Sequence, residues 1–249
     1  VPVSSVTLNQ NTLNLNKGDT YNGLVATINP SDSTIKTIAW STSDAAVASV
    51  DTSTGVITAV ADGTAIITAT IEGKSATVTV TVTTAVTSVS IDQGATKAMV
   101  KGDTDTLIAT VLPNDATDKT VSWSSDKPSV VTVDNHGNIS AVGGGTATIT
   151  AKAGTKTASI TISVRVPITR FDLAMEDQNP TILRGVKNAK TLTTIIGPED
   201  ATDDRTITWS SSDSTIATVD STGKVTGLKE GTVTITGKLN STGATVTSN

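Results

Sequence analysis

Several residue types that commonly carry chemistry are absent or rare in this sequence. Cysteine is absent, so neither disulfides nor thiol redox chemistry are available. His136 is the single histidine, and without a second base or ligand it can form neither a catalytic triad nor a zinc site. The net charge is −5 and no basic run is present, which disfavours nucleic-acid binding, because neutralising phosphates needs clustered Lys or Arg. We interpret His136 as an exposed turn residue.

Helix-forming signals are also sparse. Only four of the 23 acidic residues are Glu, and the remainder are Asp, which favours turns over helices. No apolar stretch has the period of a helix, and none is long enough to span a membrane. The chain starts with strand-like residues and not with a targeting segment. Thr, Val, Ser and Ala dominate, which predicts an all-β protein with essentially no helix and no membrane insertion.

One stretch occurs three times, beginning at Trp40, Trp123 and Trp209. In each copy an Asp follows the Trp by 11 residues, and a Gly-Thr pair opens an alternating run further on. These recurring residues are Asp51, Asp134, Asp220, Gly63, Gly145 and Gly231. Successive Trp residues lie 83 and 86 positions apart, a period that predicts tandem domains and not a solenoid of short repeats. We expect three domains, repeats one to three, at residues 1–83, 84–166 and 167–249.

Each repeat consists of short strand-like runs separated by turn signals. In repeat one we expect Tyr21–Ile28 to form a single strand, and Ile38 and Trp40 to share one face of the next strand. About seven or eight short strands with one Trp on a central strand indicate an immunoglobulin-type sandwich of two sheets. The three Trp residues would fill the three cores. Linkers of about three residues would leave the repeats little freedom, giving a stiff rod on the order of 100 Å long.

Repeat three departs most from the other two. The Lys-Gly-Asp-Thr turn found at residues 17–20 and 101–104 is replaced by Leu183–Val186. Its end, residues 244–249, alternates less clearly than the ends of repeats one and two. We expect its last strand to be short or truncated.

The shared order of residues resembles a known family. Trp, the Ser/Thr-rich turn, the Asp, the turn Gly and the Gly-Thr pair fall in register in all three repeats, as in the bacterial immunoglobulin-like domain, group 2 (BIG2). A preceding Pro-x-Asp-Ala-Thr segment at Pro113–Thr117 and Pro198–Thr202 fits as well. The family is similar to the stalk domains of intimin- and invasin-like adhesins, and is common in secreted surface proteins and phage tail and head proteins. The resemblance implies a fold and an extracellular or virion setting, but no particular ligand.

Carboxylates are the remaining candidates for metal binding. Each of the three recurring turn aspartates stands alone, whereas calcium takes six to eight oxygens, usually from several carboxylates. We interpret them as turn residues whose carboxylates accept backbone N–H bonds. Asp200, Asp203 and Asp204 form a better, though weak, candidate for Ca²⁺, and a solvated acidic loop is the competing interpretation. No other cofactor is expected.

Catalysis and sugar binding lack their usual side chains. Glycoside hydrolysis would need two acids across a cleft, and the acids here lie in turns. The Trp residues recur with an apolar partner two positions earlier and are therefore interpreted as core, while Tyr21 and Phe171 do not recur. We predict no enzymatic activity, and glycan binding would have to run through polar loops.

Open strand edges offer another mode of interaction, because an edge can pair with a strand of another chain. The weak last strand of repeat three and the extended start of the chain, residues 1–6, suggest head-to-tail strand complementation in a filament or a virion.

Three functions stay open at this point. The first is a structural and adhesion module, a spacer that makes weak multivalent contacts with host cell-surface glycans or proteins. The second is a glycan-binding module, and the third is a self-assembling subunit whose partners are neighbouring virion or surface subunits. All three place the protein outside the cell, on a bacterial surface or a phage virion. Binding surfaces are expected where the copies differ, at Asp51–Gly55, Asn114–Lys119, Glu199–Arg205 and Glu176–Lys190.

Overall fold

The computed structural model describes all residues from Val1 to Asn249. The chain packs into two compact units. The first consists of Val1–Asp92, Ile108–Ser122 and Thr150–Ser159, and the second of Gln93–Leu107, Trp123–Ile149 and Ile160–Asn249. Every sheet nevertheless takes its strands from a single repeat. The structure has no α-helix, and no helix long and apolar enough to cross a membrane. The all-β prediction is therefore confirmed.

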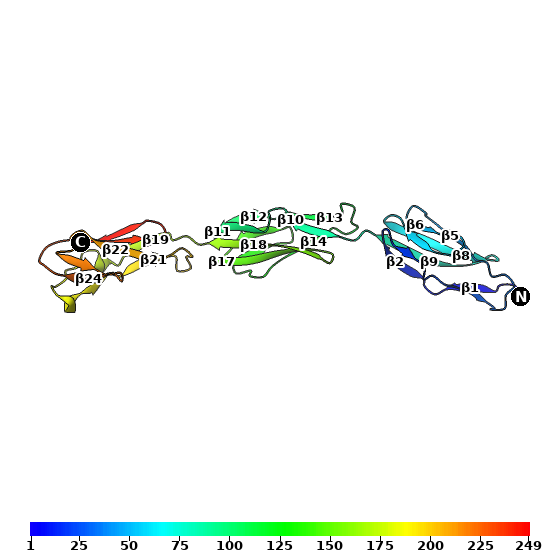
Figure 1. Cartoon of the computed structure of the whole chain (residues 1–249), viewed down its shortest axis with the longest axis horizontal. Coiled ribbons are helices and arrows are strands. Elements are labelled where there is room, and N and C mark those ends of the chain that lie inside the picture. The colour runs from blue at the N-terminus through cyan, green and yellow to red at the C-terminus, as the bar shows by residue number, and fades with distance from the viewer. The chain divides into compact units, whose positions relative to one another are not determined.

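Repeat one forms a four-stranded sheet, a three-stranded sheet and a two-stranded ribbon (Figure 1). The four-stranded sheet has the order β2 (Thr12–Asn16), β9 (Lys74–Thr83), β8 (Gly63–Ile71), β5 (Ala39–Thr42). The three-stranded sheet has the order β3 (Thr20–Tyr21), β7 (Ile57–Ala59), β6 (Ala48–Val50). The ribbon joins β1 (Ser5–Leu8) to β4 (Ala26–Asn29). Strand β2 runs parallel to β9, and the other pairs are antiparallel.

The expectation of one strand over Tyr21–Ile28 is wrong. The segment divides into β3 and β4, which belong to different sheets. Between them the chain crosses the sandwich and carries Leu24 into the core, where it is 7% exposed. At this crossing the Tyr21 side chain lies over Gly23, where a Cβ would come within 2.7 Å of the Tyr21 hydroxyl. The split raises repeat one to nine strands.

The core of repeat one follows from the alternation of its longest strands. On β8, Ala65, Ile67 and Ala69 are fully buried while Thr64 and Ile66 on the opposite face are exposed. The partner strand β9 alternates in the same way, so the period of two places both apolar rows on the face that meets the other sheet. Trp40, 6% exposed, packs into this core.

Repeat two has the same element order. Its four-stranded sheet has the order β11 (Thr96–Val100), β18 (Lys156–Arg165), β17 (Gly145–Ala153), β14 (Val121–Ser125). Its three-stranded sheet has the order β12 (Thr104–Thr106), β16 (Asn138–Ala141), β15 (Val131–Val133). A ribbon joins β10 (Ser88–Ile91) to β13 (Ala109–Leu112). Strands β11 and β18 are parallel, as β2 and β9 are.

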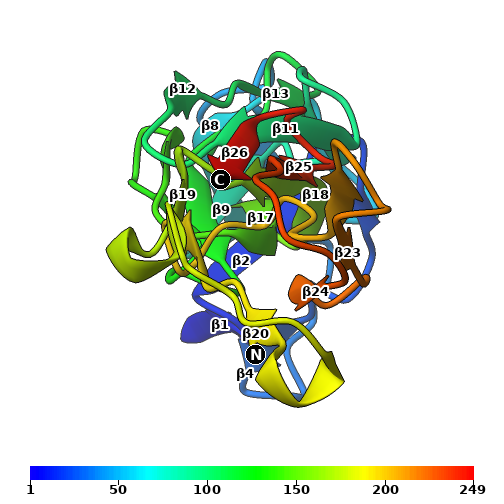
Figure 2. The same cartoon turned by 90° about the vertical axis from the view of Figure 1, so that its left-hand side faces the viewer.

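Repeat three lacks one strand of this set. One three-stranded sheet has the order β22 (Ile207–Ser211), β25 (Ile235–Leu239), β26 (Thr245–Ser248). The other has the order β20 (Lys190–Thr191), β24 (Lys224–Gly227), β23 (Ala217–Val219). A ribbon joins β19 (Arg170–Leu173) to β21 (Thr194–Gly197). Figure 2 shows β23 beside β24. In place of β2 or β11 there are two short 3-10 helices, η1 (Met175–Asp177) and η2 (Val186–Asn188). Strand β26 has four residues, whereas β9 and β18 have ten.

Candidate functional site

The turn that follows each recurring Asp is braced by that Asp. In repeat one the Asp51 Oδ1 accepts the backbone N–H of Thr54 at 2.7 Å and of Ser53 at 3.0 Å. These bonds, the one from Thr54 first, hold the pKa of Asp51 below its ordinary value, because they stabilise the ionised carboxylate. The carboxylate is thus occupied by its own turn.

The other two copies use the same arrangement. Asp134 Oδ1 accepts the backbone N–H groups of His136 and Asn138 at 2.8 and 2.9 Å, and Asp220 Oδ1 accepts those of Thr222 and Lys224 at 2.8 and 3.1 Å. The pKa of Asp134 is lowered mainly by the Asn138 side chain, and the pKa of Asp220 mainly by the Thr222 hydroxyl. His136 itself is an exposed turn residue, with 86% of its side chain accessible.

The glycine that ends each of these turns lies against the indole ring of the same repeat. A Cβ on Gly55 would lie 2.6 Å from Trp40 Cε2, and one on Gly223 would lie 2.9 Å from Trp209 Cε2. In repeat two a Cβ on Gly137 would meet the Leu107 carbonyl at 2.5 Å and the Trp ring at 3.1 Å. The sequence shows this glycine in register with the Trp, but not that the two touch. The turn therefore closes over the edge of the ring.

The glycine of each Gly-Thr pair has a related role. Gly63, Gly145 and Gly231 adopt φ angles of 146°, 129° and 153°, which L side chains rarely take up. A Cβ on Gly63 would lie 2.9 Å from a Val47 methyl. Gly63 and Gly145 are the first residues of the long strands β8 and β17. Because they have no side chain, each strand can begin close to the turn that precedes it.

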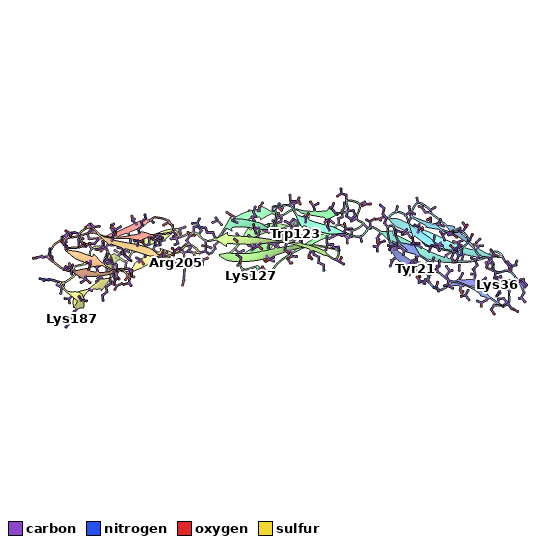
Figure 3. The ribbon with its side chains drawn as sticks, viewed as in Figure 1. Tyr21, Lys36, Trp123, Lys127, Lys187 and Arg205 are labelled. Carbon is purple, nitrogen blue, oxygen red and sulfur yellow. The ribbon has the colours of Figure 1, made fainter.

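The three Trp residues lie at equivalent positions but are covered to different degrees. Trp40 is buried, whereas Trp123 (labelled in Figure 3) and Trp209 are half-buried. Trp209 packs against the core of repeat three from its edge. The aromatic residues that do not recur are also half-buried: Tyr21 accepts a hydrogen bond from Gln10 at its hydroxyl, and Phe171 packs on the same core as Trp209.

The candidate calcium ligands of repeat three point to three separate partners. Asp200 pairs with Lys101 at 2.5 Å. Asp203 accepts two bonds from the Arg165 guanidinium, at 2.6 and 2.8 Å, and Asp204 accepts the backbone N–H of Thr206 at 3.0 Å. Each partner lowers the pKa of its carboxyl. No cluster of three or more His, Cys, Asp or Glu suitable for a metal ion is present.

In each repeat the loop that follows the Pro is braced by a basic residue. Lys36 Nζ donates to the Ser31 carbonyl at 2.9 Å, and Arg205 Nη2 donates to the Pro198 carbonyl at 2.8 Å; Figure 3 labels both basic residues. Lys119 makes the equivalent bond in repeat two. Two of the loops in which the copies differ, Asn114–Lys119 and Glu199–Arg205, are therefore held by hydrogen bonds within the loop.

One buried charge escaped the sequence analysis. Asp177 in η1 is 1% exposed and pairs with Lys190 Nζ at 2.6 Å, while its other oxygen accepts the Thr193 N–H at 2.6 Å. Burial opposes ionisation of Asp177, but Lys190 and Thr193 outweigh it, so the pKa is lowered. Asp177 thus fastens the divergent segment to the start of β20 and to Thr193, which precedes β21. In the sequence, only the presence of an acidic and a basic residue indicates this pair, because the segment has no regular spacing of apolar residues that would show which residues are buried.

Repeat three also contains two hollows. One of about 320 Å³ lies between Asn179–Ile182 and the ends of β25 and β26. In repeat one, Val80 and Val82 of β9 pair with Ala65 and Gly63 at the matching place. The other hollow, of about 410 Å³, lies between Ile168–Asp172 and the residues Thr242 and Ala244.

Together these observations define an immunoglobulin-like β-sandwich repeat protein whose recurring residues build the fold. Residues 2–83, 85–164 and 175–248 each match the family Bacterial Ig-like domain (group 2). The chain belongs to this family, and the resemblance drawn from its sequence is confirmed.

Two relatives show the range of proteins that carry such segments. An uncharacterised protein of Clostridium acetobutylicum is 40% identical over 154 residues, which is 62% of this chain and 16% of that protein. An Ig-like virion protein of Serratia phage KSP90 is 34% identical over 172 residues, covering 66% of each chain. The chain thus spans only part of the relatives it matches.

Among solved structures, the C-terminal 282-residue fragment of intimin in complex with the translocated intimin receptor is 16% identical. The match covers 72% of this chain and 68% of that one, with a TM-score of 0.37. A similarity of this size supports no functional conclusion.

Proposed function

We propose that this chain is a non-enzymatic structural and adhesion module, a spacer of tandem Ig-like domains on a bacterial surface or a phage virion. One observation carries the proposal: the Trp, Asp and turn Gly residues of the stretch that occurs three times are engaged within their own repeat. The aspartates cap their turns, and the turn glycines cover the Trp rings. The repeated residues therefore serve to build the fold of each repeat, and adding such repeats in tandem extends the length of the chain.

The spacer role predicts an elongated particle. A compact chain of this length would have a radius of gyration of about 18 Å, whereas a rod of about 100 Å would have one near 30 Å. Small-angle X-ray scattering of the dilute chain at near-physiological salt distinguishes the two. A value near the compact limit would overturn the proposal.

Contacts with other molecules would then come from the exposed loops, weakly and in several copies. Binding to host cell-surface glycans or proteins in this way gives avidity without a deep site. A glycan array is the matching experiment. Tight, saturable binding of one glycan by a monomer, abolished by changes around Phe171, would favour the glycan-binding function over the spacer function.

A second candidate is strand complementation, in which a strand of another molecule would enter the hollow between Asn179–Ile182 and the start of β25. Gly231 and Val233, which precede β25, have no strand neighbour there and correspond to Gly63 and Ala65, which β9 covers in repeat one. A strand with apolar residues at every second position would fit this hollow, as Val80 and Val82 do on β9. The start of the chain is a poor donor for it, because Val3 and Val6 are 6% exposed within repeat one and Ser4 donates to Asn29.

A peptide with the sequence of residues 77–83, TVTVTVT, provides the test. We expect it to broaden or shift the NMR signals of Thr232 and Val233 when added to the full chain. A control peptide of the same composition with the valines grouped together should not do so. Equal responses to the two peptides, or no response to either, would refute strand complementation.

A further inference from the structure

The two boundaries between successive repeats share one contact. Between repeats one and two, Lys17 Nζ lies 2.8 Å from Asp115 Oδ2, inside the first compact unit. Between repeats two and three, Lys101 Nζ lies 2.5 Å from Asp200 Oδ2, inside the second. All four side chains are at least 44% exposed, and exposed ion pairs hold their partners only weakly. This shared contact therefore does not distinguish the two boundaries.

The boundary between repeats two and three has a second and stronger ion pair. Arg165, the last residue of β18, donates from Nε to Asp203 Oδ1 at 2.6 Å and from Nη2 to Oδ2 at 2.8 Å. The Asp203 side chain is 7% exposed, and its Oδ2 also accepts the N–H of Ile168 at 3.1 Å. Two parallel bonds from one guanidinium fix the orientation of the carboxylate, and separating the pair would leave a nearly buried charge without a partner. We call the Arg165–Asp203 pair the clamp.

Close packing accompanies the clamp. Val166 is 3% exposed and exchanges two hydrogen bonds with Thr202, each at 2.9 Å. The Thr202 methyl lies over Gly144, where a Cβ would overlap it and would come within 3.1 Å of a Val166 methyl. The bare backbone at Gly144 thus lets the loop of repeat three pack against repeat two.

The boundary between repeats one and two is built on the same backbone contact. Thr117 N–H donates to the Thr84 carbonyl at 2.9 Å, and Thr84 N–H donates to the Thr117 hydroxyl at 2.6 Å, as in the exchange between Thr202 and Val166. Thr84 is half-buried, whereas Val166 is buried. The two boundaries can therefore be compared residue by residue.

The first boundary lacks the clamp. The residue at the place of Arg165 is Thr83, the last residue of β9. Asp118 stands where Asp203 stands, directly after the Pro-x-Asp-Ala-Thr segment. With no arginine to meet, Asp118 accepts the N–H of Thr120 at 2.8 Å, within its own repeat.

A carboxylate takes the place of the packing at this boundary. Asp62 stands where Gly144 stands, immediately before the Gly-Thr pair. Its Oδ1 accepts the Thr84 hydroxyl at 2.5 Å, and its Oδ2 accepts the Thr117 hydroxyl. Asp62 is exposed, so water competes for both bonds. The first boundary is thus held by polar contacts that open easily.

We propose that the boundary between repeats one and two is a hinge, whereas the clamp joins repeats two and three into one stiff segment. The proposal goes beyond the spacer function and does not rest on it, since it concerns how the chain itself bends. A hinge at one boundary lets repeat one reorient while the rest of the chain keeps its direction. Such freedom helps several weak contacts to form together.

Distances between spin labels on the full chain test the proposal. The chain has no Cys, so introduced Cys pairs are the only labelling sites. Ser75 on β9, Thr157 on β18 and Thr245 on β26 are exposed and provide one site in each repeat. We expect double electron–electron resonance to give a broader distance distribution for the pair Ser75→Cys and Thr157→Cys than for the pair Thr157→Cys and Thr245→Cys. Equal widths, or a broader distribution at the second boundary, would overturn the proposal.

Exchanging the residues of the clamp tests its assignment. Arg165→Thr should broaden the distribution at the second boundary to the width of the first, because Asp203 loses its partner. Thr83→Arg should narrow the distribution at the first boundary, because it supplies Asp118 with an arginine. Arg170→Ala is the matched control, since it removes an exposed ion pair within β19, and should alter neither width. An unchanged width in either clamp variant, or an equal change in the control, would refute the assignment.

Discussion

Repeats one and three hold the equivalent segment of their sandwiches by different interactions. In repeat one, β2 lies along β9 in parallel register over five residue pairs, and the strand contributes the buried Leu15. In repeat three the corresponding segment forms no ladder, and the buried Asp177–Lys190 pair fastens it instead. A β-ladder distributes its stabilisation over many bonds, whereas an ion pair concentrates it in two side chains. We infer that repeat three is the less cooperative sandwich.

The largest expected contrast concerns the tryptophans. Trp40→Ala should destabilise repeat one by about 3–5 kcal/mol, the usual cost of emptying a buried aromatic site. Trp209→Ala should cost repeat three less, because Trp209 is half-buried at the edge of its core. Urea unfolding followed by circular dichroism measures both. Equal losses would contradict the difference we draw between the two cores.

The next contrast concerns the ion pair. Asp177→Ala leaves Lys190 without its buried partner and should destabilise repeat three by about 3 kcal/mol. Asp172→Ala removes an exposed ion pair between Asp172 and Arg170, both on β19, and should lower the stability of repeat three by roughly 0–1 kcal/mol. Differential scanning calorimetry on both variants gives the comparison. If the two variants melt together, the buried pair does not fasten the segment.

The strand that repeat three lacks can be examined through two leucines. Leu15→Ala, at a site 9% exposed on β2, should cost about 2–3 kcal/mol. Leu183→Ala, at a site 67% exposed in the divergent segment, should change stability by no more than about 0.5 kcal/mol. Chemical unfolding of the full chain reports both values. A large loss at Leu183 would mean that the divergent segment packs more firmly than its exposure indicates.

The smallest expected effect is shared by all repeats. Asp51, Asp134 and Asp220 have lowered pKa values in the folded chain, so their turns contribute stability that is present above the ordinary carboxyl value of 3.8. That stability is lost as pH falls through the lower folded-state pKa. Replacing all three by Asn should flatten the acid limb of a plot of melting temperature against pH. An unchanged acid limb would show that other carboxyls control it.

Much of this fold could be predicted from the sequence because its signals are local. The alternation in Thr64–Ile71 predicts which residues of β8 are buried, and the register of Trp with the turn Gly predicts that both recur for one reason. The division of Tyr21–Ile28 could not be predicted, because a strand that changes sheets keeps its alternation on both sides of the crossing. Asp177 could not be recognised as buried, since its partners lie 13 and 16 residues away in an aperiodic segment.

The candidate site shows the same division. That the recurring aspartates cap turns follows from their position before Gly, a local signal. That Asp200 faces Lys101 does not, because the two residues lie 99 positions apart and belong to different repeats. Such a contact can be recognised only when the equivalent pair, Lys17 and Asp115, is seen at the preceding boundary.

The central claim of the proposal is that the chain is a series of sandwiches that unfold one at a time, and that their recurring Trp, Asp and turn Gly residues serve the fold. Single-molecule force extension of the full chain measures this most directly. We expect three unfolding events, each lengthening the chain by on the order of 250 Å, as repeats of about 80 residues at about 3.6 Å per residue would. The event at the lowest force should belong to repeat three, which has no counterpart of the β2–β9 ladder of repeat one, and Asp177→Ala should lower that force further. One cooperative event, or three events of which Asp177→Ala alters none, would contradict the account.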